Sequence, residues 1–370
     1  MAKLLMVTGL GSVKDLVSDK RGAFYNTLEE FHKYWERIDI IAPRVRGHKS
    51  GITELFGNVF IHVSRWPLIL HPFWFLKKGI EIYRAQKFDL MTVQEYPPFY
   101  NGLGAKLLEK LIKVPYIIEI HHIVGYPKAA NIKEEIYRSL MKIFIEWDSR
   151  KTKAVRVVNQ DQVPQFLIEA GIPKEKIIYI SSLYIDLDIF KPTGISKDYD
   201  LIFVGRLEAN KGVDLFLETV EKLNCKAIIV GDGALKNEIK LKIENWKLQN
   251  NILLYGWAKD QREIAELLNK SRILVMPSYN EGGPRAVVEA LACGVPVLAT
   301  PVGIVPDLLK NGLGGEIIAW DANDMASKIR ALLSDFERYQ KYSQKGLEIA
   351  RKFEKKAAIR NYADKLKLLI

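Results

Sequence analysis

Residues 279–300, YNEGGPRAVVEALACGVPVLAT, decide the fold of this chain. The apolar residues 273–276 before them are typical of a buried strand, and Glu281-Gly282-Gly283 is an acidic glycine turn. Pro284 follows at the expected first position of a helix, where its missing N–H costs nothing. Two glycines before a helix leave backbone N–H groups uncovered, with the positive end of the helix dipole behind them. The stretch therefore predicts a strand, a turn suited to a diphosphate, and a helix.

Two acidic side chains flank this predicted turn. Glu281 lies at its mouth, and Glu289 lies about 1.5 helical turns further along the chain. A carboxylate can accept hydrogen bonds from neutral hydroxyls such as those of a sugar or a ribose. The turn and the two acids together predict a pocket for a sugar joined to a nucleotide.

The run E-G-G-P-R-A-V-V-E-A-L-A-C-G-V-P-V-L-A-T resembles the E-x7-E signature of retaining GT-B glycosyltransferases of family 4, the group 1 glycosyl transferases. Residues 294–297 and the T-P-V-G-I-V-P-D turn at 300–307 match the family pattern as well. The spacing alone is weak evidence, because 44 acidic residues make it easy to meet by chance. Its place between a strand, Gly-Gly-Pro and a helix carries the resemblance. The alternative is a solvated glutamate on a surface helix beside an ordinary loop.

The chain has 370 residues, which is longer than a single hydrophobic core usually sustains, so two domains are expected. Short apolar runs alternate with amphipathic helical patterns, which favours parallel sheets covered by helices on both faces. The expected strands are residues 4–8, 38–41, 59–63, 90–93, 116–120, 154–158, 177–180, 201–204, 227–230, 252–255, 273–276, 295–299 and 316–318. The prediction is an α/β protein with two doubly wound Rossmann-like domains that face each other across a cleft, the GT-B arrangement.

A polar, turn-rich stretch at 191–198 is the best linker, so the domain boundary is expected near 190–199. Residues 1–190 would form an N-terminal, acceptor-side Rossmann-like domain, and residues 191–350 a C-terminal domain that binds the nucleotide sugar. By analogy with the resembled family, residues 351–370 would form a helix that crosses back to the N-terminal domain.

Two cations follow the expected strand at 201–204, in the pattern F-V-G-R-L-x3-K-G. Arg206, after Gly205, can clamp a phosphate with two hydrogen bonds, and Lys211 adds a compact charge. A departing nucleoside diphosphate needs both, because its negative charge grows as the bond to the sugar breaks. The matching positions of the resembled family bind the diphosphate. Taken alone, either residue would more readily be a solvated surface cation.

The expected strand at 116–120 ends in two histidines. The resembled family shows a His followed by an Asp here, so His121 falls on the His and His122 replaces the Asp. The family's His lies beside the donor sugar and stabilises a cationic, oxocarbenium-like transition state. A satisfied structural histidine is the alternative. Gly22, before an expected helix at 24–34, resembles one glycine of the family's Gly-Gly helix opening, although residues 10–21 form an unusually long expected loop.

The resemblance thus implies a retaining, metal-independent glycosyltransferase that moves a sugar from a nucleotide diphosphate sugar to an acceptor hydroxyl. One alternative is a nucleotide-sugar epimerase of the same architecture, and another is a non-catalytic nucleotide-sugar-binding subunit. No metal or cofactor is expected, because Asp186-Leu187-Asp188 has metal-binding spacing but lies in the linker. The expected catalytic residues are His121, Glu281, Arg206 and Lys211; the expected substrate-binding residues are Gly22, Gly205, Gly282, Gly283, Pro284, Arg285 and Glu289.

The formal net charge of +11 fits an anionic nucleotide or an anionic membrane surface, and it fits plain solubility equally well. No basic-aromatic nucleic-acid signature occurs, so no nucleic-acid partner is expected. Residues 66–78 place dense aromatics beside lysines, which is typical of an interfacial anchor, with a buried helix as the alternative. An anchor would favour a lipid-linked acceptor over a soluble glycan. Two cysteines without metal spacing fit the reducing cytoplasm. The expected location is therefore cytoplasmic, and peripheral on the inner face of the membrane if residues 66–78 form an anchor.

Overall fold

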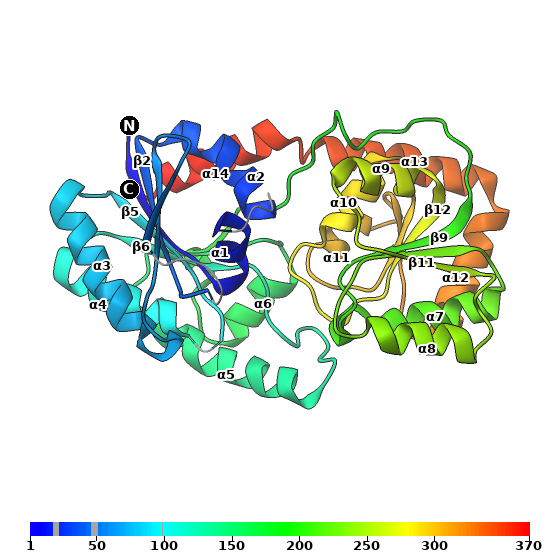
Figure 1. Ribbon diagram of the computed structural model, residues 1–370, viewed down its shortest axis with the longest axis horizontal. Helices are drawn as coiled ribbons and strands as arrows, with labels where there is room; N and C mark the ends of the chain where they lie inside the picture. The colour runs from blue at the N-terminus through cyan, green and yellow to red at the C-terminus, as the bar shows by residue number, and fades with distance from the viewer. Residues whose placement is uncertain (18–21, 46–50, 98) are drawn as a thin grey trace.

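The chain forms two β-sheets, and each is covered by helices on both faces (Figure 1). The computed structural model describes residues 1–17, 22–45, 51–97 and 99–370. The first sheet has the strand order β3-β4-β2-β1-β5-β6-β7-β8, and the second has the order β11-β10-β9-β12-β13-β14. The predicted α/β class with two doubly wound halves is confirmed.

The strands of the first sheet are β1 (Lys3–Val7), β2 (Arg37–Ala42), β3 (Gly51–Leu55), β4 (Val59–Val63), β5 (Leu90–Gln94), β6 (Tyr116–Ile120), β7 (Ala154–Val157) and β8 (Ile177–Tyr179). Those of the second are β9 (Tyr199–Val204), β10 (Ala227–Val230), β11 (Ile252–Gly256), β12 (Ser271–Met276), β13 (Val297–Ala299) and β14 (Gly315–Ile317). All described pairings are parallel except that of β3 with β4. Parallel strands buried on both faces are uniformly apolar, which is why the sequence pattern found them.

The sequence prediction missed β3. This strand is an antiparallel edge of the sheet, and its three central residues are exposed. An edge strand outside the core has no apolar run or alternation, so the pattern carried no signal for it.

The helices cover the two sheets in chain order. Those before β9 are α1 (Leu10–Val17), α2 (Ala23–Phe31), α3 (His71–Gln86), α4 (Tyr100–Ile112), α5 (Ile132–Ser149) and α6 (Gln162–Glu169), with the short 3-10 helices η1 (His32–Tyr34), η2 (Leu68–Leu70) and η3 (Lys174–Lys176). Those after it are η4 (Ala209–Lys211), α7 (Val213–Leu223), α8 (Lys236–Asn245), α9 (Gln261–Asn269), α10 (Arg285–Ala292), α11 (Val305–Leu309), α12 (Ala322–Ser334), α13 (Phe336–Arg351) and α14 (Lys355–Lys367).

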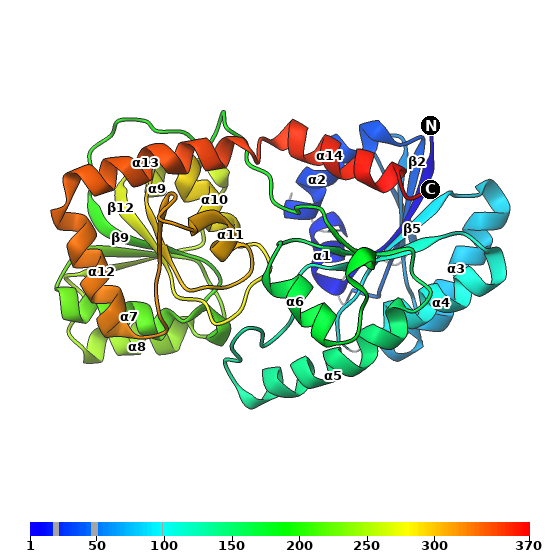
Figure 2. The same ribbon diagram turned by 180° about the vertical axis from the view of Figure 1, so that it is seen from behind.

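The chain crosses between the two sheets twice, and the two crossings touch. Ile185, between β8 and β9, donates its N–H to the carbonyl of Phe353 at 2.7 Å and accepts from the N–H of Lys355 at 3.0 Å. The second crossing leads from α13, beside the second sheet, to α14, which lies against α2 of the first sheet (Figure 2). The last helix is therefore part of the N-terminal half in space.

The aromatic segment 66–78 is divided between core and surface. Trp74 and Phe75 are buried in the core of the first half, whereas Ile69 is 70% exposed and Phe73 is 58% exposed. Two of the aromatic side chains that indicated a membrane anchor, Trp74 and Phe75, therefore pack in the core as part of α3. Among the described residues, no helix is both long and apolar enough to cross a membrane.

Two carboxyl groups are buried together behind β5. Glu95 and Asp148 flank Gly102, where an added Cβ would lie 2.3 Å from Glu95 Oε2 and 2.6 Å from Asp148 Cγ. Both oxygens of Asp148 lack a hydrogen-bond partner among the described residues. Burial raises the pKa of Asp148 from its ordinary 3.8 to about 7, and burial together with Asp148 raises the pKa of Glu95 well above its usual value. The pair therefore disfavours ionisation.

This pair predicts a loss of stability with rising pH. Between about pH 4 and pH 7 the unfolded chain releases the proton of Asp148 while the folded chain keeps it, so the free energy of unfolding falls through this window. In Asp148→Asn the folded state no longer holds this extra proton, so the Tm of the variant should exceed that of the wild type by about 10 °C at pH 8, on a scale of about 2–4 °C per kcal/mol. The difference should shrink towards pH 4, and the exposed control Asp364→Asn should show no such trend in thermal melts. A gain independent of pH would contradict the assignment.

Candidate active site

The β12–α10 loop forms one wall of the candidate site. Pro284 is the N-cap of α10 and not its first helical residue as predicted, because its ψ of 109° is extended. Arg285 therefore begins the helix. The N–H of Val287 donates to the carbonyl of Pro284 at 3.2 Å, and helix geometry gives the N–H groups of Arg285 and Ala286 no helical partner. The start of α10 is therefore a candidate for binding an anion.

Gly282 brings the two halves of the protein into contact. A Cβ built on Gly282 would lie 1.7 Å from the carbonyl oxygen of His121, which follows β6 in the first half. Only a residue without a side chain permits this approach. The loop before α10 and the end of β6 therefore lie directly against each other.

Glu281 and Lys211 form an ion pair in this loop. The Lys211 ammonium donates to Glu281 Oε1, and the Ser278 hydroxyl donates to the same oxygen at 3.1 Å. The two charged side chains are only 14% and 16% exposed. Gly212, with a φ of 65°, lets η4 approach: a Cβ there would lie 2.1 Å from the carbonyl oxygen of Pro277. The predicted donor-binding acid and one predicted cation are thus neighbours.

Glu289 lies inside α10 and Arg285 at its start. Glu289 is 8% exposed, and its burial raises the pKa of its carboxyl, which the charge of Arg285 partly offsets. The Arg285 guanidinium stacks on the ring of Tyr184, with its carbon 4.4 Å from the ring centre. The Tyr184 hydroxyl in turn donates to the carbonyl of Ala23 at 3.0 Å. Tyr184 therefore connects the first residue of α10 to the first residue of α2.

Gly22 is the N-cap of α2, and its side of the first sheet also holds His121. Part of the loop expected at residues 10–21 is instead helix α1, and residues 18–21 lie outside the described residues. The helix expected at 24–34 is α2 followed by η1. A cavity of about 60 Å³ is lined by Phe24 and Thr27 of α2 and by His121. The α2 start and His121 therefore face one small space.

Arg206 and Gly205 follow β9 at the same edge of the second sheet. The Arg206 guanidinium pairs with Glu208 at 2.9 Å, and its side chain is 60% exposed. Among the described residues it has no ion pair with the carboxylates of α10 or of the loop before it. The structure therefore joins Lys211, Glu281, Gly282 and His121, while Arg206 stands apart from them.

The sequence analysis missed Asn280, which is fully buried between the two halves. Its amide donates to the carbonyl of Lys128 at 3.0 Å and to Glu134 Oε2 at 2.8 Å, and its oxygen lies 3.0 Å from His122 Nε2. Burial lowers the pKa of His122, which favours the neutral ring. His122, where the resembled family has an Asp, therefore holds the residue next to Glu281. A single loop asparagine offers no sequence signal for this role.

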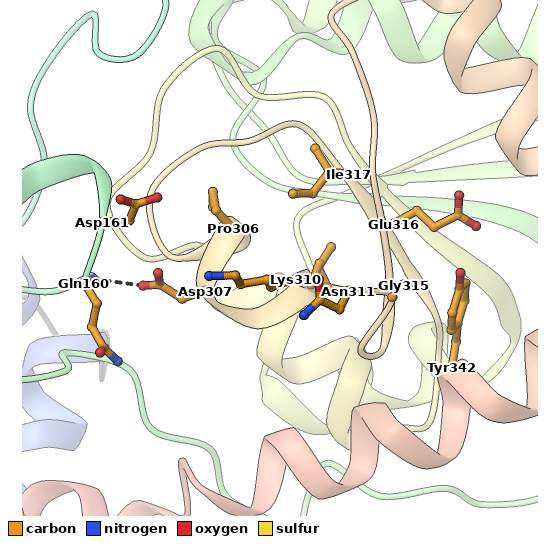
Figure 3. A pocket seen from close by; sticks show the side chains of 12 residues that line it. Gln160, Asp161, Pro306, Asp307, Lys310, Asn311, Gly315, Glu316, Ile317 and Tyr342 are labelled. Carbon is orange, nitrogen blue, oxygen red and sulfur yellow. Dashed lines mark hydrogen bonds between the residues drawn. The ribbon is translucent and has the colours of Figure 1, made fainter. Parts of the chain in front are cut away.

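A larger cavity of about 700 Å³ lies beside α11 and β14, away from these residues (Figure 3). Gln160 and Asp161 of the first half form one side, and its other side includes Asp307, Lys310 and Glu316. The N–H of Gln160 donates to Asp307 Oδ2 at 2.9 Å, which ties the halves together here. None of the residues predicted to bind the donor lines this cavity. It is a separate space between the two halves.

In the part of the chain that the structure describes, no three His, Cys, Asp or Glu side chains come together in a group that could hold a metal ion. The carboxylate of Asp186 accepts the N–H of Asp188 at 3.0 Å in a local turn of the linker. These two aspartates therefore form part of a turn where the chain passes from the first sheet to the second.

Comparison with known proteins shows what the chain is similar to. Residues 186–348, in the second half of the chain, match the family model of the glycosyl transferases group 1. The chain is 28% identical over 327 residues to an uncharacterized glycosyltransferase of Methanocaldococcus jannaschii, covering 86% of this chain and 87% of that protein.

Two further proteins are similar to this chain. The chain is 25% identical over 278 residues to the UDP-Gal:alpha-D-GlcNAc-diphosphoundecaprenol alpha-1,3-galactosyltransferase of Escherichia coli, covering 70% of each chain. The crystal structure of Anabaena HepE in complex with UDP and glucose superposes with a TM-score of 0.75 at 17% identity, covering 99% of this chain and 100% of that chain. The second likeness shows the GT-B fold.

Proposed function

We propose that this protein is a retaining, metal-independent glycosyltransferase that moves a sugar from a nucleotide diphosphate sugar to an acceptor hydroxyl. The observation that carries the proposal is the contact of the Glu281–Gly282 loop with His121. It brings an anion-binding helix start, an ammonium group and a histidine from the other half to one place. Anabaena HepE, which has the same fold, binds UDP, and this supports a nucleoside diphosphate donor.

Each side chain has a role set by its position. Lys211 and the N–H groups at the start of α10 would hold the diphosphate and neutralise the charge that develops on it. Arg206, whose exposed side chain is paired with the neighbouring Glu208, would swing to the diphosphate from the adjacent loop. Glu289 would accept hydrogen bonds from the ribose hydroxyls, and Glu281 from the donor sugar.

In this proposal the anomeric configuration is retained because the acceptor oxygen attacks the anomeric carbon from the same face that the diphosphate leaves. A double displacement needs a carboxylate free to attack the anomeric carbon. The Glu281 carboxylate is already engaged by Lys211 and Ser278, which disfavours that role. In the proposed step the bond from the anomeric carbon to the diphosphate oxygen breaks, the acceptor oxygen bonds to the same face, and the acceptor proton passes to the leaving phosphate. His121 would stand beside the cationic sugar.

A lipid-linked acceptor at an anionic membrane surface is the finer part of the proposal. The related E. coli galactosyltransferase is named for a diphosphoundecaprenol acceptor. Exposed apolar side chains of the first half also form a stripe along one face of α5, comprising Ile132, Ile136, Ile143 and Trp147. Lys106 of α4 lies 3.4 Å from the centre of the Trp147 ring. Apolar groups beside a cation suit the boundary between headgroups and acyl chains.

One experiment tests this function and its alternatives. The protein is screened by thermal shift against nucleotide sugars, because a ligand that binds only the native state raises the Tm. The stabilising donor is then incubated with EDTA, alone and with a polyprenyl diphosphate-linked sugar in anionic or zwitterionic vesicles. We expect transfer with retained anomeric configuration, unaffected by EDTA and faster on anionic vesicles. A new nucleotide sugar from donor alone would establish the epimerase, and binding without any turnover the non-catalytic subunit.

A further inference from the structure

A buried charge cluster lies directly behind His121. Glu119 of β6 and Arg156 of β7 are paired in register, and the Arg156 guanidinium donates to Glu119 Oε1 at 2.6 Å. The hydroxyl of Tyr362, from the last helix α14, donates to the same oxygen at 2.7 Å. All three side chains are buried. The cluster therefore joins two strands of the first sheet to the helix that arrives from the other half.

The carboxylate of this cluster is ionised and held in place. Burial opposes its charge, but Arg156, His121 and Tyr362 together lower the pKa of Glu119 to about 2. Arg156 also donates to the carbonyls of Ile180 and Ser181, both at 3.2 Å, and its guanidinium carbon lies 3.9 Å from the centre of the Tyr362 ring. These contacts determine the position of the carboxylate. The hydrogen bonds from Arg156 and Tyr362 both go to Oε1.

Glu119 Oε2 faces the ring of His121. The two residues are two positions apart on an extended chain, so their side chains lie on the same face. Oε2 is 3.7 Å from His121 Nε2, and this buried nitrogen has no hydrogen-bond partner among the described residues. The His121 side chain as a whole is 38% exposed and lines the cavity shared with α2. The covered edge of the ring therefore faces Glu119, and the rest of the ring is open to the site.

We propose that Glu119 is a positioning residue for His121: its second oxygen, Oε2, keeps the proton of the neutral ring on Nε2 and presents Nδ1 to the donor side, and Tyr362 links this arrangement to the position of α14. The tautomer of a histidine is set by the group that faces its other nitrogen. At 3.7 Å the two atoms are beyond ordinary hydrogen-bond distance, so the proposal requires the ring to close on Oε2 to about 3 Å. The role of His121 at the sugar rests on the proposed function; its tautomer does not.

A purely structural role would look different. If Glu119 served only to neutralise Arg156 in the core, its effect would end at protein stability. A positioning role predicts a change at His121 itself. In Glu119→Gln, Arg156 and Tyr362 still have an oxygen to donate to, and the remaining NH2 group faces Nε2. That nitrogen must then accept, and the ring proton must move to Nδ1.

Ring 15N and 13C shifts of histidine-labelled protein without ligand test this directly. The His121 signals are assigned by their loss in His121→Gln. We expect the Nε2–H tautomer in the wild type at pH 8 and the Nδ1–H tautomer in Glu119→Gln. The Nδ1–H form in the wild type overturns the proposal even if Glu119→Gln fails to fold, and an unchanged tautomer in a folded Glu119→Gln overturns it as well.

The link to α14 is tested with Tyr362→Phe and a matched control. Tyr116→Phe also removes one buried hydroxyl, which donates to the carbonyl of Asp148 at 3.1 Å and is remote from His121. We expect Tyr362→Phe to lower kcat about fivefold with an unchanged KM for the donor, and Tyr116→Phe to stay within twofold. Equal effects of the two would overturn the link. A protein without transferase activity that still shows the expected tautomers would reject the proposed function and not the Glu119–His121 pairing.

Discussion

Lys211→Met should lower kcat/KM for sugar transfer by about 10²–10³-fold, the usual cost of removing one group that stabilises developing charge. The substitution removes the ammonium that faces the expected diphosphate. It also leaves the Glu281 carboxylate, only 16% exposed, without its cation beside an anionic substrate. Two negative groups would then meet in a site of low dielectric, so binding of the nucleoside diphosphate product should weaken as well.

Glu281→Gln makes this prediction specific, because it breaks the same ion pair from the other side. Lys211 is then released for the diphosphate, so binding of UDP or GDP, measured by calorimetry, should stay as tight as in the wild type or tighten. kcat should fall by about 10²-fold, because the contact to the sugar is lost. Lys270→Met is the control, since Lys270 pairs with Glu266 next to the start of β12, at the opposite edge of the sheet. Weakened diphosphate binding in both Lys211→Met and Glu281→Gln would show that the pair acts through folding.

Gly282→Ala should lower kcat/KM by about 10²-fold while leaving both halves folded. The added Cβ would lie 1.7 Å from the carbonyl oxygen of His121, so one side of the contact must move. The contact lies between the two halves and outside either core, so the halves would separate slightly and neither would unfold. A shift of about 1 Å between reacting groups costs roughly this factor in rate. Transfer kinetics, thermal melts and small-angle scattering measure the three effects.

Gly194→Ala is the matched control for that variant. Gly194 lies in the linker with a φ of 69°, and a Cβ there would meet nothing within 4 Å. It introduces backbone strain of the kind an alanine suffers in this region without any contact between the halves. Its activity should stay within twofold of the wild type. If Gly282→Ala were as active as Gly194→Ala, the contact with His121 would not be needed for catalysis.

The sequence predicted the parts of the fold that depend on local pattern. Buried parallel strands are apolar on both faces, so the sequence shows them as apolar runs. All thirteen predicted runs, from 4–8 to 316–318, overlap strands of the described sheets. The E-x7-E stretch and the residues before it likewise predicted the strand β12, the glycine turn and the helix α10. The exposed edge strand β3 and helix α1 were missed, because neither presented the apolar run or the boundary signal on which the pattern depends.

Candidate site residues were predictable where a short motif carries them and not where partners come from distant segments. Lys211, Glu281 and Gly282 were named from the sequence, and their contacts are in the structure. Asn280 bridges to residues about 150 positions away, and Tyr362 meets Glu119 from 243 positions away. Pairs so far apart in sequence leave no local pattern.

The sequence alone thus determined that this chain forms two mainly parallel sheets with a glycine turn and a helix start after β12, because hydrophobic period and glycine placement act between near neighbours. Only the tertiary structure decided which groups meet across the two halves: Gly282 against His121, Asn280 against His122, and the last helix against the carboxylate behind the histidine. These contacts depend on how the two halves pack against each other. That packing is determined by the whole surface between them and not by any local stretch of sequence.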